Sequence, residues 1–548
     1  MKANDTLMIK FLEGSKQFVV PLYQRTYSWD VTRIATLWED IEGVKNGEEA
    51  VHFLGPFVTE PISSSASEVS KYLVIDGQQR LVTTFLFLTA LKDRIKELDP
   101  KHKLIDEIND LYLTNKYHPE EKYKLVPTQA DRQLFFDLVD GKTSSYQEYN
   151  LIMYAIAFFK EKLSTINDLT ELTILKNIVL NKFSSVDIRL ELGDNPHLIF
   201  ESLNATGTKL TQTDLIRNYL FMRIEQGHQE QIYKDVWFPL QQRLGDYLQN
   251  FARHYLAMNG IVPNIERVYT TFKEDAESKA KNEVQVVALM SRLGDFGEYY
   301  EKFLTPAKEN QIELRQGFEK LNELEVTTSY PLLLMLYDDY QNGRITSDDF
   351  ASMLKLVETF IVRRAVCGVP TNALNRYLPT IYAFLDKNKM VESLRLKLKG
   401  GTKQQRMPDD NDFMTNLMTR KLYGDRTLRY VLEAIEHHNN KEPVKMETLQ
   451  IEHIMPQTLT EEWKKQLGEN YEHVHQTYLD TLGNLTLTGY NQEYSNLTFI
   501  EKRDHEKGYR KSGIQITMEL AKFDKWTEQE ITERAKNLAI IALDIWKM

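Results

Sequence analysis

A long helical stretch between two segments that contain strands limits the possible folds more than any other feature of the sequence. From about residue 225 to residue 400, the pattern is that of amphipathic helices joined by polar connectors. A chain of 548 residues is also too long for one hydrophobic core. We therefore predict an α+β multidomain protein with domains at 1–225, 226–400 and 401–548. The stretch KLKGGTKQQRMPDDND is the expected linker into the last domain.

Composition excludes several classes of protein. No run of 18 uncharged apolar residues occurs, so we expect no membrane span, and the first residues lack the apolar segment of a signal peptide. The single cysteine, Cys367, excludes an intramolecular disulfide and a cysteine-rich zinc site. We expect a cytoplasmic protein whose sequons at Asn204, Asn484 and Asn496 carry no glycan. The net charge of −11 argues against nonspecific coating of nucleic acid but is compatible with a local basic groove.

The first 225 residues contain the clearest strands. HFLGPFVTEPI and YLVID have the composition of strands, and after GQQR apolar residues recur at helical spacing. VDIRLEL, residues 186–192, alternates with all its apolar residues on one face. We expect a short helix to follow from Asp194 to Gly207, and a second helix to begin near Thr211.

The turn between YLVID and the helix after it has the chemistry of a phosphate site. It consists of Asp76, Gly77, Gln78, Gln79 and Arg80. Free N–H groups at a helix N-terminus bind phosphate, glycine lets the backbone approach a ligand, and an arginine can add a bidentate contact. The GxxxxGK[ST] pattern of a Walker loop is absent. A plain polar turn is the alternative.

Near the C-terminus, IEHIMPQ places Glu452 beside His453 on a predicted strand that a proline ends. Thr458 and Glu461 form a capping-box pattern that predicts a helix over EEWKKQL. A second helix, YEHVHQTYLDTL, is expected to end at Gly483. GNLTLTGYNQEYSN and then a basic helix, FIEKRDHEKGYRK, complete the segment.

These residues suit the chemistry of a metal-dependent phosphodiesterase, which uses a neutral histidine to deprotonate water. Glu452 and the amide oxygen of Asn491 are ligands suited to Mg²⁺ or Mn²⁺, and Asn484 could orient the imidazole of His453. His473 and His475 are weaker candidates because positions i and i+2 of a helix do not face each other. The alternative is a strand end with one exposed charge and one satisfied histidine.

The order EHIMPQ, GNLTLT and a following asparagine resembles the HNH (His-Me finger, ββα-metal) nuclease signature in the version carried by the DUF1524 domain. The resemblance covers about the last 140 residues. It implies that His453 is the general base, Asn484 the middle asparagine and Asn491 the last metal ligand. Asn496 is an alternative for that last role.

Three N-terminal elements, PLYQRTYSW, DGQQR and FESLNATGTKLTQTDLIRN, resemble the DUF262 domain, which has a ParB-like fold related to sulfiredoxin. Such domains pair with DUF1524 in GmrSD-type type IV restriction enzymes and in the similar SspE and BrxU defence proteins. The resemblance implies binding and hydrolysis of GTP, ATP or another NTP, and sensing of modified phage DNA. With the DGQQR turn, the implied nucleotide-binding residues are Gln24, Arg25, Asn204 and Lys209.

Other residues in these elements have competing interpretations. Tyr27 and Trp29 fit a core at least as well as a platform for base stacking. Asp214 and Arg217 could form a surface pair, and Asn204 with Gly207 could be a helix C-cap.

In the helical middle, Arg363, Arg364 and Arg376 could line a DNA path or belong to a solvated face.

We expect a nucleotide-dependent, modification-dependent DNA endonuclease of an anti-phage defence system. One alternative is a ParB-like, nucleotide-switched DNA-binding regulator with a degenerate nuclease, and another is an RNA-targeting toxin. The preferred nucleotide, the DNA modification and the formation of a homo-oligomer are left open.

Overall fold

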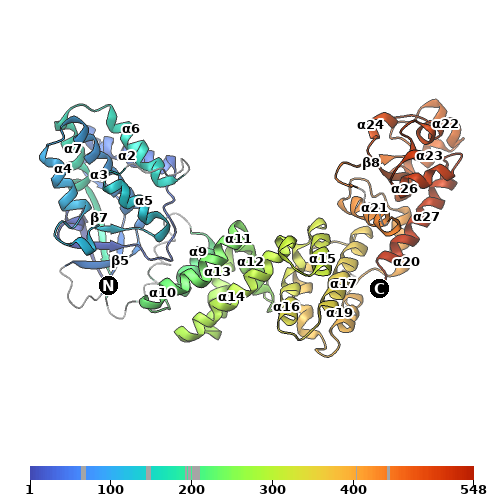
Figure 1. Cartoon of the computed structure of the whole chain (residues 1–548), viewed down its shortest axis with the longest axis horizontal. Coiled ribbons are helices and arrows are strands. Elements are labelled where there is room, and N and C mark those ends of the chain that lie inside the picture. The colour runs from blue at the N-terminus through green and yellow to red at the C-terminus, as the bar shows by residue number, and fades with distance from the viewer. Residues whose placement is uncertain are drawn as a thin grey trace. The chain divides into compact units, whose positions relative to one another are not determined.

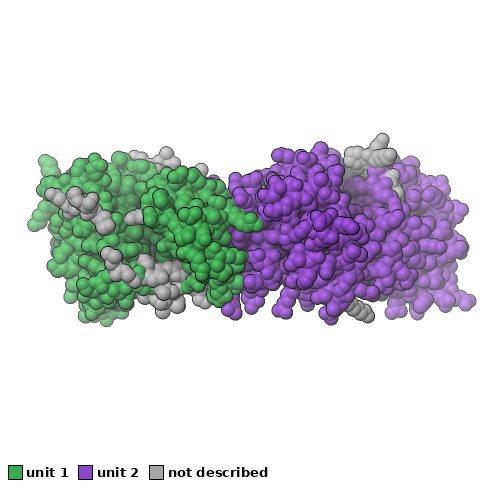
Figure 2. Space-filling model, turned by 90° about the horizontal axis from the view of Figure 1, so that it is seen from below, with its two compact units in different colours: residues 1–241, 269–292 green, residues 242–268, 293–548 purple. Residues whose placement is uncertain are grey.

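The computed structural model describes residues 1–62, 69–142, 150–191, 194, 199, 210–402, 404–440 and 445–548, without the side chains of Gln226 and Asn439. The chain forms two compact units (Figure 2). Unit 1 comprises residues 1–241 and 269–292, and unit 2 comprises residues 242–268 and 293–548. The boundaries of the three predicted domains stay a prediction.

Unit 1 contains a seven-stranded mixed sheet. Its strands are β1 (Lys2–Leu7), β2 (Lys16–Val19), β3 (His52–Phe53), β4 (Phe57–Pro61), β5 (Ser70–Asp76), β6 (Leu125–Val126) and β7 (Phe183–Arg189). The order is β1-β7-β4-β5-β2-β6, and β3 pairs with β7. β5 runs antiparallel to β4 and parallel to β2. The strand predicted from YLVID is confirmed, and the strand predicted from VDIRLEL is confirmed as far as Arg189. HFLGPFVTEPI forms two strands, β3 and β4, instead of one, because Gly55 between them has φ 103°.

Helices pack on this sheet because alternate strand residues are apolar on both of its faces. The helices before β7 are α1 (Met8–Leu12), α2 (Val31–Asn46), α3 (Gln78–Leu98), α4 (Lys103–Ile108), α5 (Gln129–Val139), α6 (Leu151–Ser164) and α7 (Leu169–Asn181) (Figure 1). One apolar core joins these seven helices to Phe57 and its neighbours. Val58, the next residue of β4, lies in a separate cluster with Ile75 and Leu215 of α9 (Gln212–Phe221). Successive strand residues face opposite sides, so α9 covers the other face of the sheet.

Local sequence explains where α9 begins. The Thr211 hydroxyl accepts from the backbone N–H of Asp214, whose carboxylate bonds back to Thr211 in a capping box. The start predicted near Thr211 is confirmed, whereas the helix predicted from Asp194 to Gly207 lies outside the described residues. Arg217 and Asp214 do pair, at 2.7 Å, but both side chains are largely buried, so the surface interpretation of this pair is wrong. Tyr27 is buried and bonds to Thr83, as the core interpretation requires.

The predicted helical stretch is confirmed between residues 226 and 399 (Figure 1). Its helices are α10 (Gln226–Ile232), α11 (Phe238–Leu244), α12 (Leu248–Ala257), α13 (Val268–Lys279), α14 (Glu283–Leu304), α15 (Ile312–Glu323), α16 (Tyr330–Gln341), α17 (Ser347–Val366), α18 (Leu374–Ile381) and α19 (Met390–Lys399). None of the described helices is long and apolar enough to cross a membrane.

The C-terminal part of unit 2 joins a small sheet to several helices. It contains α20 (Asp410–Thr419), α21 (Arg426–Asn439), β8 (Gln450–His453), α22 (Glu461–Leu467), α23 (Tyr471–Tyr478), β9 (Leu485–Thr488), α24 (Asn491–Tyr494), α25 (Phe499–Asp504), α26 (Gln515–Met518) and α27 (Glu528–Ile545). β8 and β9 are antiparallel, with His453 opposite Leu485. The mixed α+β class predicted for the chain is confirmed.

Three local predictions here need correction. Thr460, rather than Thr458, caps α22, because its hydroxyl accepts from the backbone N–H of Trp463. α23 ends at Tyr478 instead of continuing to Gly483. The basic helix is only the short α25, because the backbone leaves the helical conformation at His505, where ψ is 155°.

The predictions for the two arginines of α17 are also wrong. Arg363 and Arg364 are each 1% exposed, so neither a DNA path nor a solvated face describes them. Arg363 donates to the backbone carbonyl of Trp546 and to Asp410, while Arg364 donates to the carbonyls of Arg406 and Pro370. These bonds satisfy the carbonyls of irregular backbone and fix the predicted linker onto α17 within unit 2. Arg376 is exposed.

Candidate active sites

Strand β8 directs Glu452 and His453 to opposite faces, and both faces are covered. Glu452 is 3% exposed and His453 is 7% exposed. The glutamate faces α25, from which Lys502 reaches it, and the histidine faces Tyr423 and Asp480. The alternative of one exposed charge and one satisfied histidine is therefore wrong for the glutamate. The side-by-side pair reflects two separate buried environments on one strand.

The imidazole of His453 is held by a carboxylate and packed against an aromatic ring. Its Nε2 lies 3.1 Å from Oδ1 of Asp480, and the centroid of the Tyr423 ring is 4.3 Å away. An ionised carboxylate only accepts hydrogen bonds, so Nε2 carries the proton and Nδ1 keeps its lone pair. Burial lowers the pKa of His453 and outweighs the opposing influence of Asp480. The result is a neutral imidazole with a proton-accepting Nδ1, which is the form that a general base requires.

Sequence reasoning missed Asp480. It lies 27 residues after His453, at the end of the segment that follows α23. Its backbone carbonyl also accepts from the N–H of Leu422, which places Tyr423 over the imidazole. The only signal in the sequence is its position four residues before Asn484, in the turn that leads to β9.

Glu452 forms a buried ion pair. Its Oε1 lies 2.6 Å from Nζ of Lys502, and both side chains are almost completely buried. The same ammonium donates to the backbone carbonyls of His453, at 2.9 Å, and Ile454, at 3.2 Å. Burial raises the pKa of Glu452, and Lys502 opposes that change. Lys502 is therefore a fixed cation that holds the end of β8 beside the candidate base.

Asn484 is completely buried and has a structural set of bonds. Its Oδ1 accepts from the backbone N–H of Met455 and from Nε1 of Trp526, and its Nδ2 donates to the carbonyls of Met455 and Leu479. These four bonds complete the capacity of the amide. The imidazole of His453 is oriented by Asp480, so the predicted contact from Asn484 to the imidazole is replaced. Asn484 instead fixes the backbone that follows His453.

The remaining predicted residues of this site lie at its edge. Asn491 begins α24, and its Nδ2 is 3.4 Å from the backbone carbonyl of Ile451, next to Glu452. Asn496 is exposed, and no side-chain bond places it against β8 in the described structure. His475 bonds to the carbonyl of Pro456, whereas His473 points to solvent. Asn491 is thus the asparagine that the fold brings to the strand of His453.

In unit 1, the DGQQR turn is a strand-to-helix junction as predicted. β5 ends at Asp76, and Gly77 has φ 94°, the left-handed region that favours glycine. A Cβ at Gly77 would lie 2.5 Å from the ring of Phe57, so a side chain would not fit. α3 then begins at Gln78, and because its N-cap residue is Gly77, no side chain of that residue caps the first turn.

Arg80 points back toward the sheet. Its guanidinium lies 3.3 Å from Asp76 and 3.3 Å from the carbonyl of Leu54, over the ring of Phe57. Burial lowers the pKa of Arg80. A contact to phosphate would therefore exchange the ion pair with Asp76 for a bond to the ligand.

The structure brings the two N-terminal motifs together. Gln24 bonds to Gln78 and to the carbonyl of Ile75, and Gln79 accepts from the N–H of Ser28 and donates to the carbonyl of Thr26. The loop that carries QRTYSW is thereby fixed on the first turn of α3. Of the other predicted nucleotide-binding residues, Arg25 lies on this loop, half-buried, while Asn204 and Lys209 lie outside the described residues.

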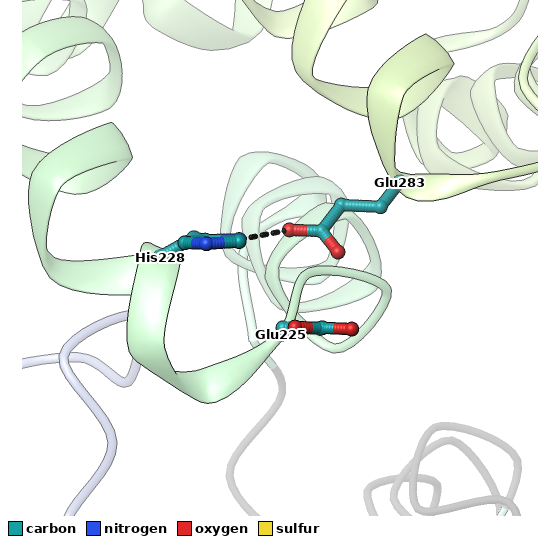
Figure 3. A group of neighbouring side chains, drawn as sticks. All are labelled: Glu225, His228 and Glu283. Atoms are coloured by element: carbon teal, nitrogen blue, oxygen red, sulfur yellow. Dashed lines mark hydrogen bonds and ion pairs between the residues drawn. The ribbon is translucent and has the colours of Figure 1, made fainter.

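One group of potential metal ligands occurs elsewhere in the described part of unit 1 (Figure 3). It consists of Glu225, His228 and Glu283, with Nδ1 of His228 2.7 Å from Oε1 of Glu283. The bond to Glu283 raises the pKa of His228, as in an ordinary ion pair. The two residues from α10 and its N-cap are exposed, and none of the three belongs to either predicted site. The geometry is accounted for by the ion pair alone.

Two family models match the chain, and together they include both candidate sites. The GmrSD restriction endonuclease N-terminal domain matches residues 8–221, which contain the DGQQR turn and the loop packed on it. The GmrSD restriction endonuclease C-terminal domain matches residues 407–541, which contain His453, Asp480 and Lys502. A search of curated proteins found no match. A restriction endonuclease cleaves DNA, and with both of its domains represented, this chain belongs to the GmrSD-type type IV restriction enzymes.

Proposed function

We propose that the chain is a nucleotide-dependent endonuclease that cleaves modified phage DNA. In this proposal, unit 1 binds and hydrolyses an NTP at the DGQQR turn, and unit 2 cleaves the phosphodiester in the manner of an HNH nuclease. The observation that carries the nuclease part is the buried, neutral imidazole of His453, held through Nε2 by Asp480. The order β8, β9, α24 around it supports the likeness to a ββα-metal nuclease.

His453 activates the attacking water in this mechanism. Nδ1 accepts a proton from water while Asp480 stabilises the imidazolium that forms, through the hydrogen bond to Nε2. Asn484 keeps the strand end in place through its bonds on both sides of Met455. Positioned base catalysis of this kind contributes about 10²- to 10⁴-fold in rate.

The expected Mg²⁺ or Mn²⁺ fits some of the predicted ligands better than others. Asn491 fits, because its amide is half-exposed and lies beside β8. Glu452 fits less well, because Lys502 already occupies Oε1 of its carboxylate and supplies a positive charge at that place. When bound, such an ion would stabilise the charge that develops on the phosphate and the leaving oxygen.

The nucleotide part is supported by the N-terminus of α3 and by the loop fixed on it. The proposal places the polyphosphate at the helix N-terminus that follows Gly77, where backbone N–H groups bind phosphate in other proteins, with Arg80 in the turn and Arg25 on the loop packed on it. In the proposed cycle, nucleotide turnover licenses or resets cleavage so that unmodified host DNA is spared. A coupling of about 1–3 kcal/mol between the two sites would regulate cleavage about 5- to 150-fold.

The test is digestion of matched modified and unmodified phage genomes by the full chain, with and without each NTP. We expect cleavage of modified DNA that depends on one NTP and on Mg²⁺ or Mn²⁺. His453→Ala should abolish cleavage and keep NTP hydrolysis, because the two reactions lie in separate units, whereas His473→Ala, an exposed histidine nearby, should keep both. Cleavage by His453→Ala at the wild-type rate would remove His453 from the mechanism.

A further inference from the structure

The side chain of Asn218, on α9, is buried in unit 1 without any partner. The residue is 1% exposed, and neither Nδ2 nor Oδ1 has a hydrogen-bond partner in the described structure. Its neighbours on the helix do not fill this role, since Arg217 and Asp214 bond to each other. Buried amides in native proteins are nearly always paired with protein, ligand or water. An amide with both ends unpaired therefore indicates a missing partner that can donate and accept.

The direction of Asn218 follows from the contacts of α9. Viewed down the helix axis, Leu215 and Met222 lie on one side of Asn218 and pack on the sheet beside Ile75. Arg217, on the other side, donates from Nε to the carbonyl of Tyr23, and Phe221 stacks on the ring of Tyr23 at 5.8 Å. At 100° per residue, Asn218 lies between these two sets of contacts. It therefore points into the angle between the end of β5 and the loop that precedes α2.

Arg25 lies on the loop that borders the same region. Its Nε is buried and has no hydrogen-bond partner in the described structure. Burial lowers the pKa of Arg25, and the carboxylates of Asp214 and Asp76 oppose this change. The preceding residue, Gln24, accepts a hydrogen bond from the side chain of Gln78 in the first turn of α3, which keeps Arg25 beside the DGQQR turn. Gln24, the residue before Arg25, bonds to the carbonyl of Ile75 at 3.1 Å. Two unpaired buried polar groups from separate elements thus flank the N-terminus of α3.

We propose that Asn218 contacts the nucleoside part of the nucleotide bound at the DGQQR turn and contributes to its selection, while Arg25 contacts the phosphates. This inference rests on the proposed nucleotide site. Phosphate oxygens only accept hydrogen bonds at neutral pH, so they could pair with Arg25 but would leave Oδ1 of Asn218 unpaired. The ribose hydroxyls and the edge of a base each present a donor beside an acceptor, which matches a primary amide.

The experiment measures binding of the four ribonucleoside triphosphates and their 2′-deoxy counterparts to the full chain by calorimetry, together with the Tm of the free protein. Asn218→Ala and Asn218→Asp are compared with Asn115→Ala. Asn115 is a matched control, since it is 5% exposed in the same unit but its amide donates to the carbonyls of Lys16 and Glu121.

We expect Asn218→Ala to weaken binding of the preferred nucleotide about 5- to 100-fold while the Tm of the free protein stays near that of the wild type. Asn115→Ala should lower the Tm of the free protein and leave nucleotide binding near that of the wild type. Loss of discrimination between ribose and deoxyribose in the Asn218 variants would identify the sugar as the partner, and loss of discrimination among bases would identify the base.

Equal weakening for every nucleotide, or a lower Tm with unchanged affinity, would overturn the inference and leave Asn218 a structural residue that binds water. If the wild type binds no nucleotide, the proposed function of unit 1 fails with it. If the wild type binds and the Asn218 variants bind equally well, only the inference about Asn218 fails.

Discussion

Replacing Lys502 with methionine tests how the candidate nuclease site is held together. The change keeps most of the volume of the side chain but removes an ammonium that is completely buried. Glu452, 4% exposed in its side chain, would then be a buried carboxylate without its counter-ion, and the carbonyls of His453 and Ile454 would lose a donor. Removing one partner of a buried ion pair destabilises a protein by about 3–5 kcal/mol.

That loss is large enough to measure in the full chain. For a unit of this size, it corresponds to a decrease in Tm on the order of 10 °C in the transition of unit 2. The assay is differential scanning calorimetry, in which the transition of unit 2 should move to lower temperature while the transition of unit 1 stays unchanged. The double variant Glu452→Gln/Lys502→Met should recover at least half of the loss, because no charge is left buried. Cleavage by the single variant should fall with the displacement of the strand end.

The loss of stability caused by Lys502→Met should also depend on pH. Burial raises the pKa of Glu452 above its unfolded value, and removal of Lys502 raises it more. A carboxyl of this kind destabilises the fold when it is ionised, so the deficit of Lys502→Met should shrink as the pH falls from 7 through the raised pKa. A single variant within about 1 kcal/mol of the wild type, or a deficit independent of pH, would refute the reasoning that the pair is buried and mutually dependent.

Asp480→Asn should lower DNA cleavage about 10²- to 10⁴-fold in single-turnover assays while the Tm changes little, because a neutral amide stabilises the imidazolium less and can donate to the ring, so that the tautomer is no longer fixed. Arg80→Ala should lower NTP hydrolysis in a folded protein, and unchanged turnover would make DGQQR a structural turn. A fragment from Gly401 should fail to fold in calorimetry, because it lacks α17, whose Arg363 bonds to the carbonyl of Trp546, and a cooperative unfolding transition of that fragment would refute this dependence.

The local elements of the chain could be predicted because each depends on neighbours in sequence. β5, Gly77 and α3 follow from an apolar strand, a glycine with positive φ and helical spacing of apolar residues. The start of α9 follows from Thr211 and Asp214. The strand with Glu452 and His453 and the strand after Asn484 follow in the same way.

What sequence reasoning missed depends on contacts between distant residues. Asp480 and Lys502 lie 27 and 49 residues from His453, and no local pattern marks either as its neighbour. Arg363 was expected at a surface because arginine is polar, but it is buried against the carbonyl of Trp546, 183 residues later. Asn484 was given a role next to the imidazole, yet its amide is fully used by Met455, Leu479 and Trp526.

These contacts explain why an acid and a histidine stand side by side on β8. On one face, Glu452 and Lys502 form an ion pair that anchors the strand end and contributes no exposed chemistry. On the other face, His453 receives a carboxylate at Nε2 and keeps Nδ1 for a proton. In the proposed mechanism, Glu452 therefore holds the end of the strand through Lys502, and His453, at the same strand end, is the base.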